Sequence, residues 1–438
     1  ISKKMNITIL GAGIASVSLA YFLQSKKNIK NITIVEKETH IGGLLRSYKI
    51  NKIHYDVGPH IIFSKHKDIL KLMLKMLENN KHKIKRSNKI VFKNEYYIKY
   101  PYENDLYKLP LNDRNIALST FLKNPYKKIK SKTMQDFFLK TFGKGIFEQY
   151  LKPYNNKIWK MHVSKLDTQM VDRIPQPPVA DIIKSANGIN TEGYRHQLYF
   201  DYPKKGGIQS LFDAFYNKLN KKKVKIIKNF KIKKIIKKNK SMIIESNKEI
   251  LETDKIVSTI PLNNFYKYFK KNENYIKTSK KLKYNSIIIS IFNVRGNKAG
   301  DNFALMVPDK NIIFHRISKL DFLGKNYSLS GTTTFEIEVT FKKGDKISKM
   351  SKNQIFQKIT QGLKKLKFIN KVSDVKFKES KTFEYAYVIY DLNHRKNVDF
   401  LIKEYAKKNI DLLGRWGSWE YLNSDQVIKQ AKDLSKKF

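Results

Sequence analysis

The chain has 438 residues, of which 41% are hydrophobic and 12% aromatic, so it can bury a large core and wholesale disorder is excluded. It carries 88 Lys and Arg residues against 38 Asp and Glu residues, a formal charge of +50, and it has no cysteine. The lack of cysteine excludes disulfides, thiolate catalysis and Cys-ligated metal sites, and no apolar run approaches the roughly 18–20 residues that cross a bilayer. We therefore expect a cytoplasmic protein of two or three lobes with no membrane span.

A glycine-rich turn belongs to the first predicted unit of the chain. Residues 6–10 form a short apolar strand, Gly11 and Gly13 follow, and apolar residues then continue at helical spacing. A second apolar strand over 32–35 ends at Glu36. In this order Gly11 permits a tight turn, Gly13 lets the backbone approach a pyrophosphate, and Glu36 accepts hydrogen bonds from a ribose diol. The unit predicts a bound dinucleotide, with a glycine turn in an ordinary α/β unit as the alternative.

A second glycine pair, Gly42 and Gly43, follows the second strand. Nicotinamide-binding folds have no need of this pair. It resembles a stretch that FAD proteins of the amine-oxidase superfamily place against the pyrophosphate and the flavin. The turn over 55–60 then brings His60 toward the flavin ring. An isolated histidine is more often structural, but this context favours a flavin contact and FAD as the dinucleotide.

The middle of the chain, residues 70–201, is predicted to be mostly helical with loops. Proline-rich turns over 153–159 and 173–178 interrupt it, and such turns after helices mark loops that line a cleft. Residues 202–208 then lead into a helix over 209–219.

Lysines dominate the strand-rich block over 224–251 and the three residues before it. Its densest runs, 221–223 and 231–240, alternate with Ile and Val, which is typical of the solvent-facing side of amphipathic strands. The whole chain has only nine arginines against 79 lysines, whereas a nucleic-acid surface usually uses Arg for bidentate and stacking contacts. We expect no specific nucleic-acid partner, and each of the few arginines stands out.

The last part of the chain alternates between the lobes. Residues 254–261 return to the nucleotide lobe, 284–340 form a β-rich wall, and 412–421 precede a helix from Asp425. The expected fold class is α/β, with a Rossmann-like FAD-binding lobe, an interleaved helical lobe and a mixed β-sheet substrate lobe. The expected domains are a discontinuous FAD-binding domain (5–70, 202–262 and 405–438), a mainly helical substrate or lid domain (71–201) and a β-sheet-rich substrate domain (263–404).

Motifs in order along nearly the whole chain resemble those of the UDP-galactopyranose mutases, within the FAD-dependent amine-oxidase superfamily. The segments that carry the resemblance are 55–64, Pro153-Tyr154-Asn155 with Lys157 and Trp159, Arg173, Phe314-His315-Arg316, Tyr387 and Tyr390, 414–421, and 425–428. Two segments depart from the mutase pattern. The family's Tyr-Pro-Thr-Pro element is Tyr-Val-Ile-Tyr over 387–390, and residues 191–198 have no counterpart, which indicates a related branch whose sugar nucleotide is UDP-galactose or a close relative.

The resemblance implies a mutase that interconverts the pyranose and furanose forms of a nucleotide-diphosphate sugar for cell-surface glycan synthesis. In these mutases N5 of reduced FAD attacks the anomeric carbon and expels UDP, so the protein mainly orients groups and stabilises charge. The resemblance places His60, Arg173 and Arg316 in catalysis, with His60 fixing the flavin geometry rather than acting as a base. It places these residues at the substrate: Tyr154, Asn155, Trp159, Arg173, Arg316, Tyr387, Tyr390 and Tyr421. No metal site is expected.

The implied cofactor is FAD, active when reduced, with NAD(P)H as a candidate reductant and a homodimer as a candidate assembly. The expected cofactor residues are Gly11, Gly13, Ile14, Ala15, Ser16, Glu36, Lys37, Gly42, Gly43, Leu44, Arg46, His60, Ile226, Gly414, Arg415, Asp425, Gln426 and Val427. Two alternatives stay open. One is an FAD-dependent oxidoreductase of amine oxidase, protoporphyrinogen oxidase or desaturase type, and the other is a basic protein that binds nucleic acid or a membrane.

Overall fold

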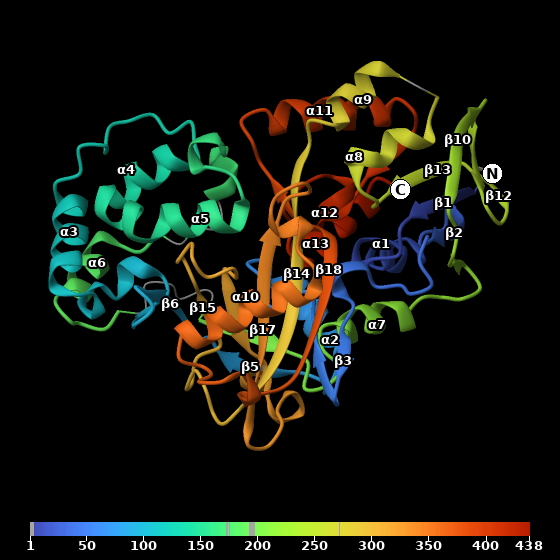
Figure 1. Ribbon diagram of the computed structural model, residues 1–438. Coiled ribbons are helices and arrows are strands. Elements are labelled where there is room, and N and C mark those ends of the chain that lie inside the picture. The colour runs from blue at the N-terminus through green and yellow to red at the C-terminus, as the bar shows by residue number, and fades with distance from the viewer. Residues whose placement is uncertain (1–3, 172–173, 175, 192–197, 271) are drawn as a thin grey trace.

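The computed structural model describes residues 4–171, 174, 176–191, 198–270 and 272–438 of the chain (Figure 1). Figure 1 shows a group of helices at one side, a large mixed sheet in the middle and a parallel sheet at the other side. The expected α/β class with a Rossmann-like parallel sheet, helices and a mixed sheet is confirmed. Among the described residues, no helix has both the length and the apolar content that crossing a membrane requires.

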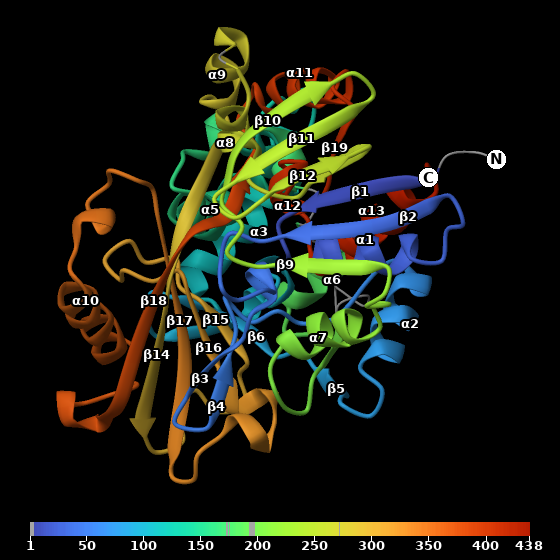
Figure 2. The ribbon, with the colours of Figure 1, turned by 90° about the vertical axis from the view of Figure 1, so that its right-hand side faces the viewer.

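The parallel sheet joins strands from distant parts of the chain (Figure 2). In spatial order its strands are β19 (Ile410–Leu412), β13 (Lys255–Ser258), β1 (Met5–Leu10), β2 (Ile29–Val35) and β9 (Val224–Ile227). All four pairings are parallel. Isoleucine is the commonest residue of β1 and β2, and most of their side chains are buried or partly buried, as expected for a sheet covered on both faces.

Helices and a small antiparallel sheet cover the parallel sheet. The helix after the first glycine turn packs against two helices from the middle and the end of the chain, which a fourth helix also contacts. These are α1 (Ile14–Leu23), α7 (Gln209–Asn217), α13 (Ser424–Ser435) and α2 (Lys67–Met76). A three-stranded sheet lies along β1 and β13 and is formed by β10 (Ile232–Lys238), β11 (Ser241–Ser246) and β12 (Ile250–Thr253).

A seven-stranded sheet forms the middle of the molecule. In spatial order its strands are β18 (Val375–Ile389), β14 (Lys283–Arg295), β17 (Thr332–Phe341), β16 (Arg316–Lys319), β15 (Ala304–Met306), β6 (Asn88–Phe92) and β7 (Tyr96–Lys99). All neighbours are antiparallel except β15 and β6, which run parallel. The amphipathic helix α10 (Lys352–Lys365) packs its apolar side chains against this sheet (Figure 2).

The helical part of the molecule is built on α3 (Leu111–Leu122), α4 (Met134–Ile146), α5 (Lys152–Trp159) and α6 (Val179–Ala186). Thr133 begins α4 with a capping box, in which its hydroxyl accepts from the Asp136 N–H and the Asp136 carboxylate accepts from the Thr133 N–H. The remaining helices are α8 (Leu262–Phe265), α9 (Glu273–Ser279), α11 (His394–Ala406) and α12 (Gly414–Gly417).

Residues 70–201 contain more strand than we expected. Besides β6 and β7 they hold β5 (His82–Lys85), which pairs with β8 (Tyr199–Tyr202), and a further hairpin lies just before them, β3 (Tyr48–Ile50) with β4 (Ile53–Tyr55). These strands have only three to five residues each, so any alternation of apolar and polar residues in them is too short to distinguish a strand from a loop. The result is that β6 and β7 extend the mixed sheet although they lie within the interval assigned to the helical domain.

Candidate active site: two adjoining cavities

A cavity of 530 Å³ lies at the carboxyl ends of the parallel strands. Gly11 follows β1, Glu36 follows β2, and Gly414 follows β19, so the strand order itself brings these residues together. The expected cofactor residues that line the cavity are Gly11, Gly13, Ile14, Ala15, Glu36, Lys37, Gly42, Gly43, Leu44, His60, Gly414, Arg415 and Val427.

The two glycine turns meet in this cavity. Gly42 N–H donates to the Ala12 carbonyl at 2.8 Å, and a Cβ added at Gly43 would lie 3.3 Å from the Cα of Gly13. Gly43 also has a φ of +56°, which disfavours side chains with a Cβ. The close approach of the two backbones therefore requires glycine at position 43, and the lack of a side chain at Gly13 leaves its backbone open to a ligand.

Glu36 is held at the end of β2 by backbone donors. Its Oε2 accepts from Ala12 N–H at 2.9 Å, and its Oε1 accepts from Glu38 N–H at 3.0 Å. The carboxylate thus lines the cavity in one orientation and retains lone pairs for a diol.

Five expected cofactor residues do not appear in the cavity lining, namely Ser16, Arg46, Ile226, Asp425 and Gln426. The Ser16 hydroxyl donates to the Gly11 carbonyl at 2.6 Å and so fixes the first turn from behind. Ile226 pairs with Ile34 in the sheet, and the Gln426 side chain accepts from Asn423 N–H as part of a capping box that begins α13. Contact of these five with a cofactor stays a prediction.

A second cavity of 250 Å³ adjoins the first, and both are lined by Leu44, His60, Arg415 and Ser424. Of the expected substrate residues, Arg316, Tyr387 and Tyr421 line it. Two residues that we had not named line it as well, namely Arg86, between β5 and β6, and Asn88, the first residue of β6. The described lining of this cavity has three arginines and no carboxylate.

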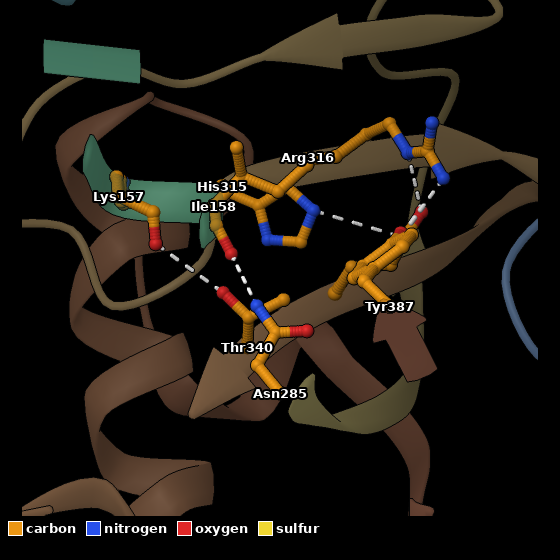
Figure 3. A network of polar contacts seen from close by, with 8 residues as sticks. Lys157, Ile158, Asn285, His315, Arg316, Thr340 and Tyr387 are labelled. Atoms are coloured by element: carbon orange, nitrogen blue, oxygen red, sulfur yellow. Dashed lines mark hydrogen bonds and ion pairs between the residues drawn. The ribbon is translucent and has the colours of Figure 1, made fainter. Parts of the chain in front are cut away.

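Arg316 is held by a carboxylate behind the cavity wall (Figure 3). Its Nε and Nη2 donate to the two carboxylate oxygens of Glu338 at 2.5 and 2.8 Å, and the Tyr387 hydroxyl donates to Glu338 Oε2 at 3.3 Å. Burial opposes the charge of Arg316, but Glu338 outweighs it and holds the pKa of Arg316 well above its usual value. The guanidinium is therefore a permanent cation in a set orientation.

His60 lies between the two cavities as a neutral group. Burial, and secondly the charge of Arg415, lower the pKa of His60 to about 3. A neutral imidazole with so low a pKa is a weak base, which fits the expectation that His60 orients the flavin and does not take up protons.

The other expected substrate residues lie behind the cavity wall. Trp159 donates to Asn155 Oδ1 at 2.8 Å and packs its ring edge-to-face against Tyr387 and Tyr421 at 5.6 and 5.8 Å. Tyr390 accepts a hydrogen bond from the Tyr421 N–H at 2.5 Å. These residues support the two tyrosines that line the cavity.

Tyr154 stacks on Tyr150 at 5.4 Å and is also absent from the described cavity linings. Arg173 lies outside the described residues, as do residues 192–197 of the segment that departs from the mutase pattern. The scarcity of arginine was the one signal that singled out Arg86, because the strands on either side of it, β5 and β6, were not predicted.

Comparisons with known proteins agree with this geometry. Residues 9–76 match the family model of an NAD(P)-binding Rossmann-like domain. UDP-galactopyranose mutase of Mycoplasma genitalium is 23% identical over 181 residues, 39% of this chain and 44% of that protein. Coproporphyrinogen III oxidase of Staphylococcus aureus is 24% identical over 310 residues, 62% of this chain and 64% of that protein. Each alignment therefore spans less than two thirds of the relative.

Two solved structures superpose on nearly the whole length of this chain. A crystal structure of reduced UDP-galactopyranose mutase superposes with a TM-score of 0.89 at 21% identity, covering 99% of this chain and 95% of that one. A putative protoporphyrinogen oxidase from Exiguobacterium sp. 255-15 superposes with a TM-score of 0.78 at 15% identity, covering 100% and 98%. The chain therefore has the fold of these two enzymes.

The residues of the first cavity fit FAD. The paired glycine backbones suit a pyrophosphate, and Glu36 suits a ribose. Among the described residues, the buried Nε1 of Trp416 and Nδ1 of His60 have no hydrogen-bond partner in the protein, and both residues line the cavity. FAD is the cofactor that these residues fit, and His60 and Leu44, which line both cavities, are the residues that would contact its ring.

Proposed function

We propose that this chain, which has the fold of UDP-galactopyranose mutase and takes FAD as its cofactor, interconverts the pyranose and furanose forms of a nucleotide-diphosphate sugar. The observation that carries the proposal is the second cavity, whose described lining has three arginines and no carboxylate beside the cofactor cavity. Such a lining favours a substrate with several negative charges, and a diphosphate meets that requirement.

The reduced flavin would supply the nucleophile for the anomeric carbon. The protein's own groups then have to hold the diphosphate while it leaves and returns. Arg316 is suited to this task because Glu338 fixes its orientation before substrate arrives, so little side-chain entropy is lost on binding. Tyr387 and Tyr421 line the same cavity and would add hydroxyl donors to the phosphates.

The sugar ring would lie near His60, at the junction of the two cavities. The neutral imidazole of His60 adds no charge there, so the charge of the diphosphate is balanced by the guanidinium groups of the cavity lining alone. The product would serve the synthesis of furanose-containing glycans at the cell surface.

A second candidate function is an oxidase that acts on a porphyrinogen. The alignment with the staphylococcal coproporphyrinogen III oxidase covers more of this chain than the alignment with the mycoplasma mutase. The carboxylates of a porphyrinogen would also suit an arginine-lined cavity.

One experiment separates the two functions. Dithionite-reduced protein and an oxidised control are incubated with UDP-galactofuranose, and the products are separated by ion-exchange chromatography. We expect UDP-galactopyranose only from the reduced protein, and its loss in Arg316→Ala. Oxygen consumption with coproporphyrinogen III, without conversion of the nucleotide sugar, would overturn the mutase proposal in favour of the oxidase.

A further inference from the structure

A third cavity, of 880 Å³, lies on the opposite face of α5 from the candidate active site. Asn155, Ile158 and Trp159 form the buried face of this helix. Pro153, Asn156, Lys157 and Lys160 lie about half a helical turn away and line the cavity. The cavity is therefore separate from the two already described and shares no lining residue with them.

Lysines surround this cavity. Its lining includes six lysines and two carboxylates, and both carboxylates already have a lysine partner. Glu148 pairs with Lys152 at 2.9 Å, and Asp309 pairs with Lys365 at 2.7 Å. Within the described part of the chain, no carboxylate lies within ion-pair distance of Lys157, Lys160, Lys310 or Lys358.

Lys157 and Lys160 are partly buried and lie one turn apart at the end of α5. The Lys157 ammonium donates to the carbonyls of Val307 and Asp309 at 2.7 and 2.8 Å. Burial lowers the pKa of both lysines, and the charge of Lys160 lowers that of Lys157 further. Asp309 attracts Lys157 and Asp345 attracts Lys160, but neither forms an ion pair with it and burial outweighs both, so a bound anion would reduce the cost of holding the two cations together.

The floor of the cavity is apolar. Val91, Phe92 and Ile312 are at most 5% exposed, and Ile347 and Met350 line the cavity as partly buried residues. A fully hydrated inorganic anion would leave this surface in contact with water. An anion that carries an apolar group would cover the floor and neutralise the lysines at once.

We propose that this cavity binds an organic phosphate, with the phosphate at Lys157 and Lys160 and the apolar body on Phe92, Ile312 and Met350. The site does not depend on the proposed function, because it lies on the other face of α5. Both a lipid phosphate headgroup and a soluble phosphate ester have the required chemistry. The dependence of affinity on the length of the alkyl chain distinguishes the two kinds of ligand.

The test is isothermal titration calorimetry of the full chain with bound FAD, using octyl phosphate, ethyl phosphate and inorganic phosphate as separate ligands. The variant is Lys160→Gln, and the matched control is Lys140→Gln, which removes an exposed lysine of α4 that lines none of the cavities described. Excess UDP in a parallel titration shows whether the phosphate occupies the candidate active site instead.

We expect octyl phosphate to bind one site more tightly than inorganic phosphate, unaffected by UDP, and to lose about tenfold or more in affinity in Lys160→Gln only. Tight binding of ethyl phosphate would identify a soluble ester, and weak binding a lipid-like ligand. Equal loss in both variants, competition by UDP, or no saturable binding would overturn the proposal. If Lys160→Gln does not fold, Lys358→Gln at the exposed rim serves as the variant.

Discussion

Arg316 and Glu338 form a bidentate ion pair across neighbouring strands, in register at the same position of β16 and β17. Glu338 is fully buried, whereas the Arg316 side chain is 29% exposed and reaches the candidate substrate cavity. His315 lies 3.7 Å from the same carboxylate, but burial, and secondly Arg316, hold its pKa well below the usual value, so it is neutral. Glu338 therefore depends on Arg316 for its counter-charge.

Arg316→Ala should lower the free energy of unfolding by about 3–5 kcal/mol, because it leaves a buried carboxylate without its cation. Arg316→Met combined with Glu338→Gln should recover most of this stability, because no buried charge remains, and should still lack nucleotide-sugar binding. Urea unfolding at pH 7 measures the first effect. Arg295→Ala, an exposed arginine at the end of β14, is the control, and an equal loss there would refute the explanation.

Tyr390→Phe should raise the KM for the nucleotide sugar several-fold with a smaller change in kcat. The Tyr390 hydroxyl accepts from the Tyr421 N–H and donates to Glu420 at 2.9 Å, so its loss releases the backbone that carries Tyr421. Stability should fall by about 0.5–1.5 kcal/mol. The control is Tyr405→Phe, whose buried hydroxyl has no hydrogen-bond partner among the described residues. A larger effect in the control would contradict the argument.

Gly13→Ala and Gly43→Ala should separate cofactor binding from stability. A Cβ at Gly13 meets only the Gly43 Cα at 3.9 Å, so the apoprotein should keep its melting temperature while FAD retention falls. Gly43 has a φ of +56°, and a Cβ there would lie 3.3 Å from the Cα of Gly13. Gly43→Ala should therefore also lower the free energy of unfolding by about 1–2 kcal/mol. Flavin absorbance after purification measures FAD retention, and thermal unfolding of the apoproteins measures stability. Full FAD retention by Gly13→Ala would exclude a close approach of the pyrophosphate.

Asp56 should make stability depend on pH in an unusual direction. Burial raises the pKa of Asp56 from 3.8 to about 6, although Ser47 and Tyr202 each donate to its carboxylate at 2.6 Å. The folded state then holds the proton more tightly than the unfolded state, so raising the pH from about 4 to 6 lowers the free energy of unfolding by about 2 kcal/mol.

Asp56→Asn removes this titration. The stability of the variant relative to the unmodified chain should therefore rise between pH 4 and pH 7 in urea unfolding. Parallel curves over this range would show that the carboxyl does not titrate there.

The parts of the site that could be predicted from the sequence are those in which one short segment carries the whole pattern. Gly11, Gly13 and Glu36 belong to a single strand-turn-helix-strand unit, so their spacing predicts the cavity they line. Arg316 and Tyr387 were named from the resemblance alone, and both line the second cavity.

The missed residues depend on pairing between distant segments. Asn88 reaches the second cavity because β6 runs parallel to β15, where Asn88 pairs with Ala304, and no local pattern encodes that pairing. Asn155 and Trp159 were expected at the substrate. They lie one turn apart on α5 and are hydrogen-bonded to each other, and Trp159 packs against Tyr387 and Tyr421, which line the cavity instead. In these cases the sequence indicated which residue types belong near the site, but it did not indicate in which direction each side chain points.

The strand order of the parallel sheet also sets a time at which the cofactor cavity becomes complete. Its wall combines the turn after β1 with Gly414 and Val427, near the other end of the chain. During synthesis, the ribosome must release residue 427 before that wall exists, although β1 and β2 emerge first. A nascent chain that exposes only β1 and β2 therefore lacks part of this wall, and its amino-terminal unit has to fold before the cofactor cavity is complete.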